Sequence, residues 1–180
     1  MSNGFKVPVP INEPIKDYAP NSEEKKSLVV KLNELSSKKV EIPIIIDGKE
    51  IKTGNTGNCI KPYDHAHILG TYHKAGEKEV KMAIESSLDA WNDWSQTSFE
   101  FRAKIFLKMA DLLAGPYRDK INAATMLAQS KTIFQAEIDA ACELIDFLKF
   151  NVYSMQHIYS QQPKSDPGVW NQLGYRPLEG

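Results

Sequence analysis

Apolar residues recur from residue 134 to residue 159 at alternating intervals of four and three positions. The unbroken series is Phe134, Ile138, Ala141, Ile145, Leu148, Val152, Met155 and Tyr159. Residues at these intervals lie on one side of an α-helix, so the segment predicts a long helix with one apolar face. Such a seam also suits a coiled coil, but Leu144 and Phe147 widen it, which favours packing in a globular core.

Shorter apolar stripes predict further helices before this segment. Asn21 or Ser22 can cap the first of them, which carries Leu28, Leu32 and Leu35 on one face. From Glu77 onward two more stripes follow: Val80, Ile84, Leu88 and Trp91, then Phe101, Ile105, Met109 and Leu112. Gly115-Pro116 ends that second stripe and starts a helix that runs to about Gln129. Aromatic residues at the junction of the two stripes are interpreted as core: Trp91, Trp94, Phe99 and Phe101.

Strand signals are confined to short segments. Asp47-Gly48 lies between the β-prone runs 41–46 and 49–51, which predicts a hairpin with a type I′ turn because Gly accepts a positive φ. Residues 53–58 are interpreted as a plain loop, since they match neither phosphate-binding glycine pattern and no helix follows them directly. Other short strands are expected at Ile60, Ile68–Tyr72 and Val169–Tyr175.

Composition excludes several classes of partner. The 22 basic and 23 acidic residues give a net charge of −1, so no basic field attracts nucleic acid. No apolar run approaches the roughly 18 residues that span a bilayer. Residues 1–8 lack the features of a signal or transit peptide, so we expect a cytoplasmic location. Cys59 and Cys142 are far apart and argue against a disulfide framework.

One carboxylate falls on the apolar side of the long helix. On a helical wheel Glu137 lies beside Leu144, Leu148 and Met155, whereas Asp139, Glu143 and Asp146 lie together on the opposite, solvated side. A buried carboxylate costs several kcal/mol unless it is paired or hydrogen-bonded. Glu137 is therefore either a structural tether for a backbone amide, Lys or Arg, or a residue beside a ligand pocket.

Other reactive residue types form no convincing constellation. His65 and His67 can place both rings on one side of a strand, but no third ligand stands at a suitable spacing, so no metal site is expected. Cys142 lies in the long helix, where a small buried apolar side chain is the commoner explanation. The residues alone thus predict a soluble, mostly helical module with one carboxylate in an unexpected place.

Several motifs resemble one protein family. The segment from Ala124 through Gln129-Ser130-Lys131-Thr132 to Phe147 resembles the long-helix region of the 1-pyrroline-5-carboxylate dehydrogenases, within the aldehyde dehydrogenase superfamily. The resemblance covers essentially all 180 residues; Gly174 departs from it, because an acidic residue is expected there. Further matches are Asn12-Glu13-Pro14, Tyr18-Ala19-Pro20, residues 53–56, Pro62-Tyr63-Asp64-His65, Gln161-Gln162-Pro163 and residues 175–180.

The resemblance implies an α/β, aldehyde dehydrogenase-like fold of which this portion is mostly helical. It implies short strands and a hairpin, and it implies that most of the dinucleotide-binding sheet is lacking. Residues 1–20 would form an extended arm and residues 21–163 the helical part of the NAD-binding domain. Residues 164–180 would begin the oligomerisation strand segment of a homo-oligomer.

The resemblance also implies NAD-dependent oxidation of the aldehyde L-glutamate γ-semialdehyde to L-glutamate in proline degradation. In this family a cysteine thiolate attacks the aldehyde and hydride passes to the nicotinamide. No catalytic, cofactor-binding or metal-binding residue is carried over to this chain, and only Glu137 matches a position near the aldehyde pocket. We therefore expect the remainder of the dehydrogenase polypeptide as a partner.

These implications leave the isolated chain with a testable set of properties. It is expected to be inactive, to bind no NAD alone and to behave poorly in solution, because its apolar faces would pack on missing elements. A stand-alone helical interaction module without activity is the alternative. A bifunctional proline-oxidising protein with the same domain is less favoured, because Met1 stands directly before the arm.

Overall fold

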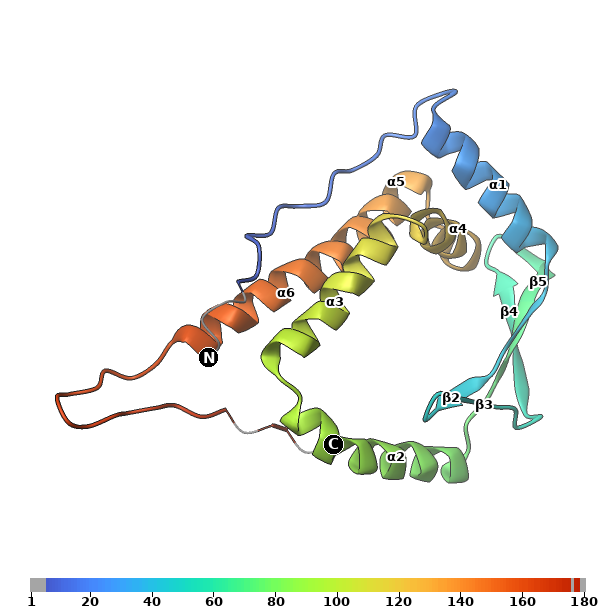
Figure 1. The fold of residues 1–180 in the computed structure, drawn as a ribbon. Helices are drawn as coiled ribbons and strands as arrows, with labels where there is room; N and C mark the ends of the chain where they lie inside the picture. Colours follow the sequence, from blue (N-terminus) through green and yellow to red (C-terminus); the bar gives the residue numbers. More distant parts are fainter. Residues whose placement is uncertain (1–5, 176, 179–180) are drawn as a thin grey trace.

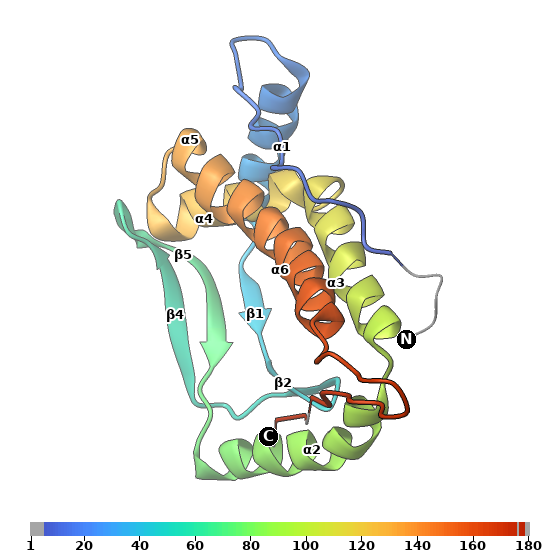
Figure 2. The same ribbon diagram turned by 90° about the vertical axis from the view of Figure 1, so that its left-hand side faces the viewer.

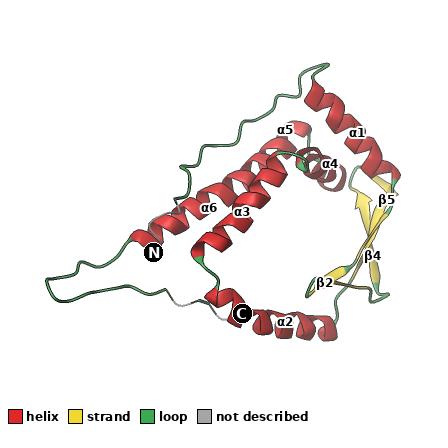
Figure 3. Cartoon of the chain, viewed as in Figure 1, coloured by secondary structure: helices red, strands yellow, loops and turns green. Residues whose placement is uncertain are grey.

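The computed structural model describes residues 6–175, 177 and 178 of the chain. Helices dominate this part of the chain, and the strands lie together at one end of the molecule (Figures 1 and 3). The helices are α1 (Glu23–Ser37), α2 (Glu77–Gln96), α3 (Phe99–Ala114), α4 (Arg118–Gln129), α5 (Ile133–Ala136), the π-helical η1 (Glu137–Cys142) and α6 (Glu143–Ser160). The strands are β1 (Val40–Ile42), β2 (Ile44–Ile46), β3 (Lys49–Ile51), β4 (Thr56–Lys61) and β5 (Asp64–His73).

The long helix forms as predicted, except that a π-helical turn interrupts it. Elements α5, η1 and α6 follow one another without a break, and the helix packs along α3 (Figures 1 and 2). Ala110 of α3 meets Ala141 and Ile145 in a fully buried cluster, so small side chains bring the two helices close together. The seam therefore packs into a globular core, as its width indicated, although its first member, Phe134, is 65% exposed.

The predicted start of α1 is confirmed. The Ser22 side chain caps the helix by accepting a hydrogen bond from the Lys25 amide, and Leu28 is buried. Leu28 packs with Tyr18 and Ala123, which joins the end of the arm, α1 and α4 in one apolar cluster.

Two small sheets carry the strands. The predicted hairpin is present as β2 and β3, and φ is 52° at Asp47 and 68° at Gly48, as a type I′ turn requires. The predicted run 41–46 is divided at Pro43, which has no amide hydrogen to donate to a ladder, so β1 pairs with β5 instead. Strand β4 begins at Thr56, so the loop predicted over 53–58 is shorter than expected.

Two predicted apolar stripes are not buried among the described residues. Helix α2 has no buried residue, and Val80, Ile84 and Leu88 are all more than half exposed. Helix α3 buries Ala103 and Ala110 rather than the stripe that begins at Phe101. The interpretation of the junction aromatics as core is wrong for Trp94 and Phe101, which are exposed. Periodicity identified the helices correctly but could not supply what covers their apolar faces.

The strand predicted at Val169–Tyr175 is absent. These residues contain no strand in the structure, and Trp170 is 82% exposed. They fold back locally through the Gln162 side chain, which bonds both the amide and the carbonyl of Leu173. A strand needs a neighbouring backbone to complete its ladder, and no described element pairs with this segment. Residues 176, 179 and 180 of the predicted oligomerisation segment lie outside the described residues.

Candidate functional site: a buried ionic cluster beneath the N-terminal arm

Glu137 begins the π-helical turn and its side chain is fully buried. A π-helix bonds residues five apart instead of four, as the Glu143 amide does here with the Ile138 carbonyl. Residues five apart consequently stack, and the Cys142 thiol lies 3.8 Å from Glu137 Oε1. The turn therefore directs the carboxylate into the interior, between the long helix and α4.

Arg118, at the start of α4, is the principal partner of Glu137. Its Nη2 lies 2.5 Å from Glu137 Oε1, and its Nε donates to both carboxylate oxygens at 3.2 and 3.3 Å. The Arg118 side chain is only 3% exposed. From the next turn of α4, Asn122 Nδ2 donates to Glu137 Oε2 at 2.8 Å. This geometry places a fork-shaped cation against a planar anion where water is excluded.

The arm provides the other half of the cluster. Glu13 Oε1 accepts from Arg118 Nη1 at 2.6 Å, and Glu13 Oε2 accepts from Lys149 Nζ at 2.8 Å. The Lys16 amide and the Tyr18 hydroxyl donate to Glu137 at 2.8 and 2.9 Å. Two acidic side chains, one from the arm and one from the long helix, thus share one buried arginine.

The cluster shifts the protonation of its members in opposite directions. Burial by itself raises the pKa of Glu137, but hydrogen bonds from Arg118, the Lys16 amide, Asn122 and Tyr18 outweigh it, so the pKa is lowered. Burial and the neighbouring carboxylate raise the pKa of Tyr18. Burial likewise raises the pKa of Cys142 to about 11, so that thiol stays protonated at neutral pH. The buried arrangement is an ionised acid–arginine pair beside neutral donors.

The contacts of Glu137 are those of a tether. Both carboxylate oxygens accept several hydrogen bonds, and the donors are a backbone amide and an arginine together with Tyr18 and Asn122. A carboxylate in this state has few lone pairs left for a further ligand. Its role beside a substrate pocket stays a prediction. Asn122 Oδ1 is buried without a hydrogen-bond partner in the described part of the chain.

Asp146 corrects one expectation from the helical wheel. It was placed on the solvated side of the helix, but it is half-buried and accepts hydrogen bonds from the arm. The Glu13 amide and the Asn12 side chain each lie 2.7 Å from its carboxylate oxygens. The π turn rotates the residues after it relative to those before it, which moves Asp146 out of line with Asp139.

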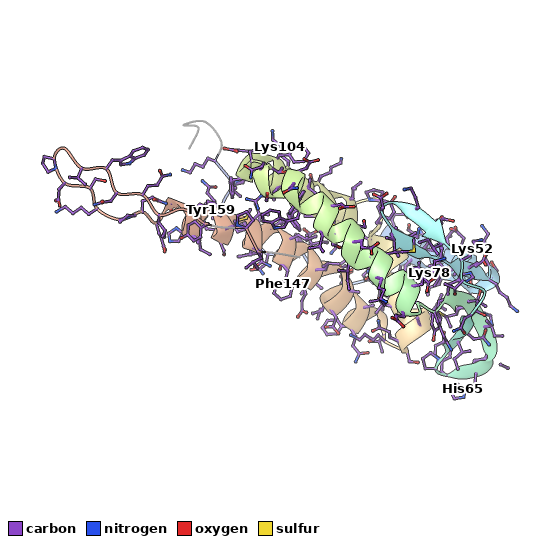
Figure 4. All side chains as sticks on the ribbon, turned by 90° about the horizontal axis from the view of Figure 1, so that it is seen from below. Lys52, His65, Lys78, Lys104, Phe147 and Tyr159 are labelled. Atoms are coloured by element: carbon purple, nitrogen blue, oxygen red, sulfur yellow. The ribbon has the colours of Figure 1, made fainter. Side chains whose placement is uncertain are left out.

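The histidines and cysteines form no second site. His65 lies at the β4–β5 end of the molecule and is exposed (Figure 4), whereas His67 bonds the Ser36 carbonyl. His73 is enclosed between the Gly54 amide and Glu41. Among residues 6–175, 177 and 178, no group of three metal-ligating side chains comes together. Cys59 is half-buried in β4 and Cys142 is buried.

Sequence reasoning missed most members of the cluster. Arg118, Asn122 and Glu13 were not singled out individually, because each looks like an ordinary polar residue near a helix end or in a proline-rich arm. The one available signal was the misplaced carboxylate, which requires a buried partner. Its wheel position could not show where along the chain that partner stands.

Comparison with known proteins defines the class of protein. The profile of the aldehyde dehydrogenase family matches residues 50–180, and the chain therefore belongs to that family. The helix-rich arrangement matches that part of solved aldehyde dehydrogenases, which confirms the expected fold class.

No helix among the described residues is long and apolar enough to cross a membrane.

Within the family the chain is similar to the 1-pyrroline-5-carboxylate dehydrogenases, as its motifs indicated. It is 47% identical over 98% of its length to the probable enzyme of Schizosaccharomyces pombe, of which it covers 32%. It is 39% identical to the mitochondrial human enzyme over 94% of its length, covering 30% of that protein. The crystal structure of the Mycobacterium tuberculosis enzyme bound with NAD superposes with a TM-score of 0.97 at 47% identity, over 100% of this chain and 34% of that one. The chain thus spans about a third of the length of these relatives.

Proposed function

We propose that a polypeptide containing this chain oxidises L-glutamate γ-semialdehyde to L-glutamate with reduction of NAD⁺, as a step of proline degradation. The observation that carries the proposal is the similarity to the Mycobacterium dehydrogenase along the whole chain, in sequence and in fold together. A local motif would support only a shared element, whereas 47% identity over the full length of this chain supports a shared role for all of it.

NAD would bind outside the described residues. The N-termini of α3 and α5 are occupied by the Ser98 and Thr132 side chains, and Glu79 bonds the amide of Gly76 at the start of α2. A dinucleotide needs free amides at such an end, next to a glycine-rich turn. Helix α4 has no side-chain cap, but its first residue, Arg118, is held in the buried pairs with Glu13 and Glu137. We therefore assign NAD binding to the remainder of the polypeptide and no step of the reaction to the described residues.

The role proposed for this chain is to support the rest of the dehydrogenase. Between α3 and α6 lies an apolar hollow of about 350 Å³, lined by Phe106, Phe147, Leu148, Asn151, Val152 and Met155. Phe147 is 61% exposed on α6 (Figure 4), and the α2 stripe is open as well. Apolar surface of this extent marks a contact surface in soluble proteins. We assign it to the remainder of the polypeptide; assembly into a homo-oligomer stays a prediction.

A chimera tests the proposal directly. The aligned third of the Mycobacterium dehydrogenase is replaced by residues 1–180 of this chain, and NADH formation is followed by absorbance with the semialdehyde as substrate. We expect turnover by the chimera and none by the isolated chain. A chimera that folds, binds NAD and yet fails to oxidise the semialdehyde would contradict the proposal. Turnover by the isolated chain would contradict the assignment of its supporting role.

The alternative is a stand-alone helical interaction module. The same open stripes on α2 and α3 would then receive another protein, and no dehydrogenase would depend on this chain. The chimera separates the two, because an unrelated module would not complete the active enzyme. The cytoplasmic location also stays a prediction, since relatives from Dictyostelium discoideum and human are named mitochondrial.

A further inference from the structure

The arm is held to the helices entirely by contacts between distant parts of the chain. Residues 6–19 form neither helix nor strand. The Val7 amide donates to Gln156, 149 positions away, and Asn12 donates to Asp146, 134 positions away. Between them and Tyr18 lie Glu13 and Lys16, which bond the ionic cluster. Since the segment has no helix or sheet ladder of its own, its conformation depends on this docking.

The docking sites belong to α4, η1 and α6. Arg118 contributes from α4, Glu137 from η1, and Asp146, Lys149 and Gln156 from α6. Figure 1 shows the arm running beside α6 and past α5 toward α1, and its bonds to Arg118 connect it to α4 as well, so that it acts as a strap across α4 and the long helix. Arg118 also donates to the Pro14 carbonyl at 2.8 Å. One guanidinium therefore binds both a side chain of the arm, that of Glu13, and the arm's backbone.

The π turn and the arm meet at Glu137. A π-helix is a rare conformation, found mostly as a single turn inside an α-helix and frequently at functional sites. Here the turn directs Glu137 inward. Its carboxylate accepts two hydrogen bonds from the arm, one from the Lys16 amide and one from the Tyr18 hydroxyl. Without the arm, the buried Glu137 carboxylate would lose these two donors, and the π turn that directs it inward would become less favourable.

The joint between arm and α1 is strained. Tyr18 has a φ of 53°, in the left-handed region that bulky side chains avoid, whereas the φ of 68° at Asn21 is one that asparagine adopts readily. Such strain persists only where the surroundings impose it. The docked arm imposes it here, because Tyr18 is held by Glu137, Asn122 and the apolar cluster with Leu28.

We propose that the arm is a docking strap locked by Glu13 on Arg118, and that docking of the strap and formation of the π turn are one coupled event. This inference is independent of the proposed function, because it concerns the conformation of the chain itself. When the strap is released, the joint at Tyr18–Asn21 relaxes and residues 137–142 lose the π conformation. The long helix therefore has two registers, and the arm selects between them.

Hydrogen exchange of two amides in the full chain tests the coupling. The Lys16 amide reports docking because it donates to Glu137, and the Glu143 amide reports the π turn because it donates to Ile138. The variant is Glu13→Gln, which keeps the shape of the side chain but removes its charge. We expect exchange of both amides to accelerate together, roughly tenfold to a hundredfold.

The matched control is Asp17→Asn. This change removes the same charge from the same arm, but the Asp17 carboxylate bonds only the nearby Ala19 amide among the contacts seen. Exchange at both reporter amides should then stay within about twofold of the unaltered chain. If Glu13→Gln does not fold, Lys149→Met replaces it, since it removes one partner of Glu13 from a partly exposed position.

Two results would overturn the inference. Faster exchange at Lys16 with unchanged exchange at Glu143 would show that the π turn stands without the arm. Unchanged exchange at both amides would show that Glu13 does not lock the strap. A parallel rise at both amides, with the control unchanged, is the outcome that the coupling requires.

Discussion

Replacing Arg118 by methionine should destabilise the fold strongly. The substitution keeps an unbranched side chain but leaves the Glu137 carboxylate, which is 0% exposed, without its counter-charge. Removing one partner of a buried ion pair costs about 3–5 kcal/mol, because the remaining charge can neither reach water nor find another cation. We expect a loss in that range at pH 7, which is a large part of the ~5–15 kcal/mol that stabilises a typical domain.

The pH dependence of this loss gives a sharper test. In the unaltered chain the pKa of Glu137 is lowered, so its stabilisation is fully present above 4.5, the ordinary glutamate pKa, and is lost as pH falls through the lowered value. In Arg118→Met the largest of the effects that lower the pKa is gone, while burial, which raises it, remains. Protonation of Glu137 then relieves the buried charge, so the loss should shrink between pH 7 and pH 5.

Urea denaturation monitored by circular dichroism at several pH values measures both effects. Lys26→Met is the control, because Lys26 pairs with Glu23 on the exposed surface of α1, where both side chains are more than half exposed. That change should leave the urea midpoint within experimental error. A loss below about 1 kcal/mol for Arg118→Met, or one that stays constant with pH, would refute the view of Glu137 as a buried charge held by this arginine.

Three further predictions concern other parts of the chain. Ser22→Ala should cost about 1 kcal/mol in the free energy of unfolding, measured by urea denaturation, because it removes the cap of α1. Gly70→Ala should cost roughly 1–3 kcal/mol, since a Cβ there meets the backbone of the facing strand β1, whereas Gly174→Ala, with open space around it, should cost nothing measurable. A thiol reagent at neutral pH should modify Cys142 far more slowly than Cys59, because Cys142 is buried with a pKa of about 11, and urea should abolish the difference.

Local features were predictable because their causes are local. The hairpin at Asp47-Gly48 depends on two residues that accept a positive φ, and the start of α1 depends on one hydroxyl three residues before an amide. The helices likewise follow from apolar spacing within a few turns. Pro43 is a local cause as well. It has no amide hydrogen to donate, so it divides the run 41–46, which looked continuous in the sequence.

Burial was less predictable because it depends on what lies opposite. The stripes on α2 and α3 have the spacing of buried faces, yet Val80 and Phe101 are exposed in the described chain. The relatives are about three times as long, and the proposed assignment of these stripes to their remaining length accounts for the spacing. Val169–Tyr175 failed for a related reason, since a strand is a property of two neighbouring backbones and not of one.

The ionic cluster combines both kinds of cause. A wheel drawn at a constant angle put Glu137 in line with Leu144 and Leu148, which are only partly buried. The π turn uses about one residue more than an α turn, so it moves Glu137 into line with Ile145 and Val152, the fully buried side of the helix. The wheel therefore detected a carboxylate on the apolar side of the helix but understated how deeply it is buried. Nothing in the spacing predicts the extra residue, because the turn follows from a distant arginine and an arm that together make a buried carboxylate favourable.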